Sequence, residues 1–161
     1  MPFLSEADQD QLKDIFSKQM QRKVRLRVLT KPTSKLYIPG QQRCARCAEA
    51  EPFARELAGL SEKLEVAVHD VQAEPEIAEQ YAVDGALPIL KVERVTEDES
   101  DASDTLGAIR FLGLAAGYEF STLIADIVDV SNGAVALSQG TQDELRGLDQ
   151  DLHLQVFVTP T

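Results

Sequence analysis

The sequence predicts an α/β protein in which helices flank a mixed four-stranded sheet. Helical and strand patterns alternate through the first half of the chain, an order typical of parallel strands joined by crossover helices. The last two predicted strands follow one another without a helix between them, which favours a hairpin. The only two cysteines, Cys44 and Cys47, form a Cys-x-x-Cys motif where one of the helices is predicted to begin.

The composition is that of an acidic globular protein. The chain has 161 residues, 43% of them hydrophobic, and a formal net charge of −11, so it can bury one good core. Nucleic acid and anionic membranes are not expected as partners, because both are bound by basic surfaces. We expect no signal or transit peptide and no membrane span, since no basic region precedes an apolar run and no apolar run is long enough.

The first half of the chain contains the strongest periodic patterns. Its predicted elements are a helix entered at Ser5–Asp8 that buries Leu12, Ile15, Phe16 and Met20, a strand at Val24–Thr30, a helix from about Cys44 to Leu60, and a strand at Leu64–Asp70. Pro52 is expected to kink the second helix, because proline removes a helical hydrogen bond. The weakest signal is Leu36–Ile38, which fits a short additional strand.

The second half continues the alternation and then pairs two strands. Its predicted elements are a short helix at Pro75–Glu79, strands at Leu87–Val92 and Ile109–Leu112, and a helix at Gly117–Val130 closed by Asn132-Gly133. Pro88 stands at the mouth of a strand, which indicates an edge position, a strand start or a cis bond. The acidic run Glu97–Asp104 is predicted to be a solvated hairpin loop.

The last residues weakly repeat the beginning of the chain. Gln142–Arg146 is similar to Gln9–Lys13, and Leu154–Thr159 is similar to Val24–Thr30. A helix followed by a strand therefore recurs in the same sense. The alternative is a C-terminal helix and edge strand that carry no repeat.

The Cys-x-x-Cys motif favours redox chemistry. A thiolate at a helix N-terminus is stabilised by free backbone N–H groups and by the helix dipole, so Cys44 is predicted to attack and Cys47 to resolve. Without a secretory signal, such a pair in the cytoplasm is more often catalytic or metal-binding than structural. A structural zinc site would need His69 and His153, which are not in a paired spacing. A permanent disulfide here closes too short a loop to constrain the unfolded chain strongly.

The wider context of the motif resembles the thioredoxin fold. The matching features are Cys44 and Cys47 followed by Pro52, Val66–Asp70 followed by Pro75, Tyr81–Val83, and Leu87-Pro88-Ile89. Two further segments, Ile109–Phe120 and Leu154–Thr161, are similar to the glutaredoxin-like protein disulfide oxidoreductases. Those proteins carry two thioredoxin-fold units in tandem, each with a Cys-x-x-Cys motif. The resemblance covers nearly the whole chain.

This resemblance implies a thioredoxin-like, three-layer fold and a division into two parts. Residues 1–137 would form one unit containing the Cys-x-x-Cys site, and residues 138–161 would begin a second unit whose own motif lies beyond Thr161. The implied function is that of a thiol-disulfide oxidoreductase acting on protein disulfides. The alternative is a redox-inactive or weakly active docking or relay module of a larger two-site protein.

The resemblance also implies roles for individual residues. Pro88, in cis, would face the cysteines and let the backbone of Leu87 pair with an extended substrate. Arg43 and Arg46 would favour the Cys44 thiolate; the alternative is that they are ordinary solvated charges. The only redox group would be the Cys44–Cys47 disulfide, with no bound cofactor or metal, re-reduced by a flavoprotein or a thioredoxin-type protein in the cytoplasm. The strand before the motif offers no carboxylate as a proton acceptor for Cys47.

Overall fold

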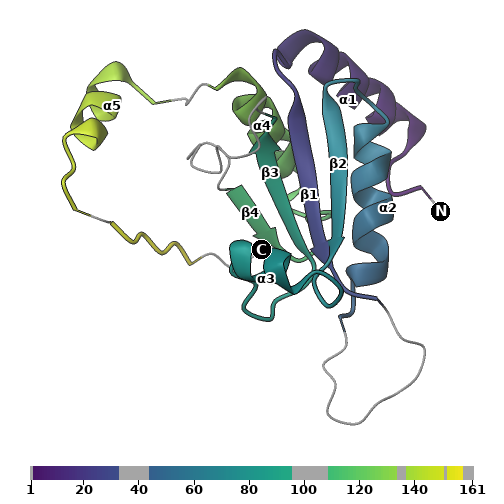
Figure 1. Cartoon of the computed structure of the whole chain (residues 1–161). Helices are drawn as coiled ribbons and strands as arrows, with labels where there is room; N and C mark the ends of the chain where they lie inside the picture. Colours follow the sequence, from purple (N-terminus) through teal and green to yellow (C-terminus); the bar gives the residue numbers. More distant parts are fainter. Residues whose placement is uncertain (1, 33–43, 96–108, 134–136, 151, 158–161) are drawn as a thin grey trace.

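The structure is a computed structural model that describes residues 2–32, 44–95, 109–133, 137–150 and 152–157. Its elements in chain order are α1 (Glu6–Gln19), β1 (Val24–Thr30), α2 (Cys47–Ala58), β2 (Leu64–Asp70), α3 (Pro75–Gln80), β3 (Ile89–Arg94), β4 (Ile109–Leu112), α4 (Phe120–Asn132) and α5 (Gln139–Arg146) (Figure 1). The predicted stretches 36–38 and 97–104 lie outside the described residues.

The sheet is mixed and four-stranded, as the sequence predicts. The strand order is β2-β1-β3-β4. β1 pairs in parallel with β2 and antiparallel with β3, and β3 and β4 form an antiparallel pair. The parallel pair is connected through α2, which is the crossover helix that such a pair requires.

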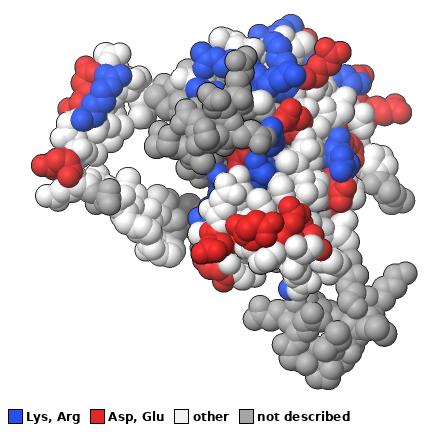
Figure 2. Space-filling model, in the orientation of Figure 1, with Lys and Arg blue, Asp and Glu red and all other residues white. Residues whose placement is uncertain are grey.

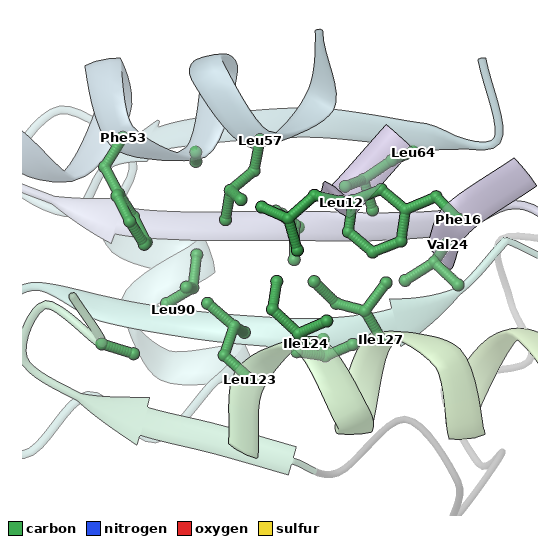
Figure 3. Close-up of a cluster of buried hydrophobic side chains, with 14 of the residues drawn as sticks. Leu12, Phe16, Val24, Phe53, Leu57, Leu64, Leu90, Leu123, Ile124 and Ile127 are labelled. Atoms are coloured by element: carbon green, nitrogen blue, oxygen red, sulfur yellow. The ribbon is translucent and has the colours of Figure 1, made fainter. Parts of the chain in front are cut away.

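The hydrophobic core lies on one face of this sheet. Val24, Leu26 and Val28 of β1 point to the same face, because side chains alternate along a strand. Helices α1, α2 and α4 cover that face, and Figure 3 shows their apolar side chains meeting those of the sheet. The short helix α3 lies on the opposite face, where the ring of Tyr81 covers Arg27 and Lys91.

Local sequence signals explain where α1 begins and where α4 ends. The Ser5 hydroxyl accepts a hydrogen bond from the Asp8 backbone, and the Asp8 carboxylate accepts one from the Ser5 backbone, which together form a capping box for α1. Helix α4 ends at Gly133, whose φ of 65° favours glycine. A Cβ at Gly133 would also lie 2.6 Å from the Arg94 guanidinium.

Two predicted helix starts are too early. α2 begins at Cys47 rather than near Cys44, because Arg46 has the non-helical dihedral angles φ −117° and ψ 2°. α4 begins at Phe120 rather than at Gly117. Pro52 lies inside α2, as the sequence predicts. The difference at α2 matters because it places Cys44 just before the helix instead of inside its first turn.

The predicted C-terminal strand is wrong for the part of it that the structure describes. Helix α5 forms and stands apart from the sheet, but residues 152–157 are in no strand (Figure 1). A strand is held by hydrogen bonds to a neighbouring strand, and among the described residues none pairs with this segment. Leu154 and Phe157 are therefore 87% and 89% exposed.

The described helices are short compared with the thickness of a bilayer. The longest of them, α1, has 14 residues, whereas a spanning helix needs about 20 apolar residues. Within the described ranges, no helix combines the length and the apolar character that crossing a membrane demands.

The packing of α2 gives a first prediction. Leu57 is fully buried in the core, so Leu57→Ala is expected to lower the free energy of unfolding by about 2–5 kcal/mol through lost burial and the remaining cavity. Urea denaturation followed by circular dichroism measures this change. Leu154→Ala makes the same truncation at an exposed site and is expected to change stability by less than about 0.5 kcal/mol. Equal effects of the two substitutions would contradict the described core.

Candidate functional site

Cys44 and Cys47 form a disulfide at the N-terminus of α2, with their Cα atoms 5.5 Å apart. The two cysteines differ in exposure. Cys44 is partly exposed, whereas Cys47 is 4% exposed and belongs to the buried residues of α2. Cys44 is therefore the more accessible residue of the pair.

Core packing fixes the position of this disulfide. The buried face of α2 packs against β1 and β2 through Ala50, Phe53, Ala54 and Leu57. At the end of β1, the Thr30 hydroxyl donates a hydrogen bond of 3.3 Å to the carbonyl oxygen of Cys47. The helix N-terminus is thus tied to the carboxyl end of the central strand.

Pro88 lies at the same end of the sheet. Ile89 is the register partner of Leu29, so Pro88 lies beside Thr30, the residue that contacts Cys47. The Leu87–Pro88 peptide bond is cis, the isomer that the resemblance to the thioredoxin fold implies. The Pro88 carbonyl accepts a hydrogen bond of 2.7 Å from the Gly113 backbone.

The positive charge of Arg46, beside the cysteines, is partly offset by an ion pair. Arg46 forms a 3.1 Å ion pair with Glu49 in the first turn of α2, and both side chains are about half exposed. Solvent screens such a pair, and its carboxylate offsets part of the positive charge that Arg46 presents to the sulfurs. Arg43, the other predicted modulating residue, lies outside the described part of the chain.

A second cluster of polar residues lies on the sheet face opposite the core. Arg27 and Glu93, both largely buried, form an ion pair of 3.0 Å. His69 lies between Arg27 and Glu74, with distances of 2.6 Å from Nε2 to the guanidinium and 2.8 Å from Nδ1 to the carboxylate. Because a guanidinium can only donate, Nε2 accepts and the Nδ1 proton is donated to Glu74.

The cluster changes the titration of two of its members. The hydrogen bond from His69 lowers the pKa of the Glu74 carboxyl. Burial is the main cause that raises the pKa of Tyr81, and the nearby Glu93 carboxylate raises it further. Sequence reasoning missed this cluster. Its only sequence signal is that Arg25 and Arg27 alternate with apolar residues along β1, and no pattern indicates that Glu74 would meet them.

The described residues do not form the structural zinc site that the sequence left open as an alternative. No three side chains among the described histidine, cysteine, aspartate and glutamate residues lie close enough together to hold a metal ion. His69 uses both ring nitrogens in the cluster with Arg27 and Glu74, and His153 lies in the exposed tail.

Surface charge is unevenly distributed around the molecule. Figure 2 shows acidic side chains gathered over α3, and those of Glu74, Glu76 and Glu79 belong to this region. Lysine and arginine gather at the far end of the molecule from α3. The surface over α3 therefore disfavours a strongly acidic partner at that position.

The sheet topology, the flanking helices and the disulfide at the start of α2 define a thioredoxin-like domain with a Cys-x-x-Cys pair. No family model matches the sequence, and no curated protein matches it significantly. Solved structures match the fold. One is the NTD_N/C domain of alkylhydroperoxide reductase AhpF from Enterococcus faecalis, with a TM-score of 0.68 and 20% identity over 88% of this chain.

Two further structures match equally well. A mutant form of AhpF from the same organism has a TM-score of 0.68 and 20% identity over 91% of this chain. A protein disulfide oxidoreductase from Aeropyrum pernix has a TM-score of 0.69 and 17% identity over 92% of this chain. This chain covers 59%, 62% and 56% of the three matched chains, in the order given.

The Glu74 contact gives a second prediction. A carboxyl with a lowered pKa in the folded state stabilises the fold fully above its ordinary pKa of 4.5, and this stabilisation is lost as the pH falls through the folded value. Glu74→Gln is therefore expected to be less stable than the parent at pH 7, with a difference that shrinks below about pH 4.5. Urea unfolding at several pH values measures it. Glu76→Gln controls for the loss of one charge from α3, and a difference for Glu74→Gln that does not vary with pH would contradict the assignment.

Proposed function

We propose that this protein is a thiol-disulfide oxidoreductase that exchanges electrons with protein disulfides through Cys44 and Cys47. The observation that carries this proposal is the disulfide between a partly exposed Cys44 and a buried Cys47 at the start of α2. The thioredoxin-like fold and the likeness to a protein disulfide oxidoreductase support it.

The reaction begins with both thiols reduced. The Cys44 thiolate attacks one sulfur of a substrate disulfide, forms a mixed disulfide, and expels the other substrate sulfur as a thiolate. The Cys47 thiolate then attacks the Cys44 sulfur and releases the second substrate thiolate. Two electrons pass to the substrate, its two thiolates take up two protons, and the chain is left with the Cys44–Cys47 disulfide.

The difference in burial supports this division of labour. Cys44 precedes α2, and its sulfur is bonded to that of Cys47, the first residue of the helix, whose N-terminus favours an anionic sulfur. Cys47 is buried, and the residue that its sulfur contacts is Cys44. A resolving thiol that the substrate cannot reach prevents a second mixed disulfide from forming there.

We propose that the backbone of Leu87 holds the substrate. Leu87 precedes β3, so its peptide groups lie outside the hydrogen-bond ladder of the sheet. The carbonyl of the next residue, Pro88, is already bound by Gly113. An extended substrate segment can therefore pair with Leu87 beside the cysteines, as an added strand pairs with a sheet edge.

We further propose that the activity belongs to a larger, two-unit protein of the cytoplasm. The exposed apolar side chains of Leu154, Val156 and Phe157 support residues 138–161 as the start of a second unit, because such a segment requires a partner. The partial coverage of all three matched structures agrees with this. A flavoprotein or a thioredoxin-type protein would re-reduce the disulfide.

Insulin reduction tests the proposed activity directly. In the presence of dithiothreitol, the parent is expected to accelerate insulin precipitation, and Cys44→Ser is expected to abolish this activity because the attacking sulfur is lost. Cys47→Ser should retain the attack but accumulate a mixed disulfide with the substrate, which mass spectrometry detects.

The alternative function, a docking or relay module, predicts different results. The ion pair between Arg46 and Glu49 favours it, since it weakens the positive charge beside the cysteines. In that case the parent would not accelerate insulin reduction, and partner binding would survive Cys44→Ser. Turnover by Cys44→Ser equal to that of the parent would overturn the proposed nucleophile.

The redox potential tests the role of Arg46. A cation near Cys44 stabilises the thiolate and hence the reduced form, so Arg46→Ala is expected to make the couple more reducing. The shift should be small, on the order of 10 mV or about 0.5 kcal/mol, because Glu49 and solvent screen the charge. Arg55→Ala, which breaks the ion pair with Glu51 later in the same helix, is the matched control. No shift, or a shift to more oxidising values, would contradict the role.

A further inference from the structure

A groove lies between α1 and α4 on the helical side of the molecule. It encloses about 510 Å³, and its floor is apolar, formed by Leu12 and Ile15 of α1 with Ile124 and Val128 of α4. Figure 3 shows Leu12 and Ile124 within the same core cluster. Neither cysteine lines this groove, so it is separate from the disulfide.

The two helices run in the same direction along the groove. At one end, the segment that follows α1 is bound to the last turn of α4, because the Ser131 hydroxyl accepts hydrogen bonds from the backbone N–H groups of Gln21 and Arg22. At the other end, Phe120 opens α4 and packs against Phe53 with ring centroids 6.2 Å apart. On α4 the lining runs from Phe120 to Asp129, which is about 15 Å of helix and matches about three turns of a docked helix.

The groove has an acidic residue near each end, and its lining contains no lysine or arginine among the residues that the structure describes. Asp8 lies in the first turn of α1, where its carboxylate accepts hydrogen bonds from the backbone N–H and the hydroxyl of Ser5. Asp129 lies near the end of α4. Helix α4 contains no lysine or arginine. Asp126 is next to Ala125 in the sequence but outside the lining. Burial raises its pKa, and the Asp129 carboxylate raises it further. A cation beside Asp129 would offset part of the negative charge at this end of the groove.

Charge decides which occupant fits. A second copy of this chain would bring together two molecules of net charge −11, and its own acidic helices would face the acidic ends of the groove. In helix α5, Asp143 is paired with Arg146, but Glu144 and Asp149 add negative charge near the apolar residues of α5 and the tail, which is also unfavourable. An anionic membrane would be repelled for the same reason.

We propose that the groove between α1 and α4 binds a basic amphipathic helix of a partner protein. Apolar side chains of the partner, spaced three and four residues apart, would lie on the floor of Leu12, Ile15, Ile124 and Val128. Arginine or lysine side chains at the two ends of that helix would pair with Asp8 and Asp129. Because the groove is separate from Cys44, the partner can remain bound while disulfide exchange proceeds.

A designed peptide tests this proposal on the full chain. The probe is a fluorescent 14-residue helical peptide with leucines along one face and arginines at both ends, and its twin carries glutamates in place of the arginines. Anisotropy titration is expected to show that the arginine peptide binds at least about tenfold more tightly, with an affinity that falls as salt is raised. Cross-peaks that shift in an NMR titration are expected to belong to α1 and α4.

Two variants of α4 locate the binding site. Ala125→Arg places a long cation in the groove and should weaken the arginine peptide by at least about tenfold. Thr122→Arg adds the same cation to the same helix at an exposed position outside the lining and should change the affinity by less than about threefold. Circular dichroism verifies that both variants fold, and both should retain insulin reduction.

Several outcomes would overturn the proposal. These are no binding of the arginine peptide, equal affinities of the arginine and glutamate peptides, an unchanged affinity in Ala125→Arg, or shifts that map to the cysteine end. If the parent self-associates and Ala125→Arg makes it monomeric, the groove belongs to a second copy instead. Because the readout is binding, its failure is distinct from a failure of disulfide exchange.

Discussion

The packing of α2 against the first two strands determines where the Cys44–Cys47 disulfide lies. Ala50, Phe53, Ala54 and Leu57 are buried on one face of the helix, and their contacts fix its N-terminus over the end of β1. Thr30 then meets the backbone of Cys47, and Pro88 lies beside it across the sheet. The asymmetry between an accessible and a covered sulfur follows from this single packing arrangement, because Cys47 is the first residue of the packed helix.

The sequence predicts most of the elements because their signals are local. Leu64–Asp70 and Ile109–Leu112 match their predicted bounds, since strand alternation and turn residues identify them. The start of α2 depends on backbone angles at Arg46, which no residue pattern specifies. The cluster of Arg27, His69, Glu74 and Glu93 and the groove between α1 and α4 bring together distant parts of the chain, so neither can be read from spacing along the sequence.

The two faces of the sheet differ in composition, and the disulfide and the groove lie at different places. One face is apolar and covered by three helices, while the other holds a charged cluster under Tyr81 and α3. The disulfide occupies one end of the sheet, and the groove lies between two helices away from it. The proposed exchange at the sulfurs and the proposed recognition of a partner can therefore be tested independently. Residues 152–157 pair with no strand among the described residues. A strand pattern in the sequence is therefore not sufficient, because a strand also needs a neighbouring strand to bind.

The rate of alkylation at each cysteine of the reduced protein tests the asymmetry of the two cysteines most directly. Mass spectrometry after brief exposure to iodoacetamide distinguishes Cys44 from Cys47. We expect Cys44 to react first, because it is the more exposed of the two, and Cys47 to stay protected while the protein is folded. Equal rates at the two cysteines, or faster reaction at Cys47, would contradict this asymmetry.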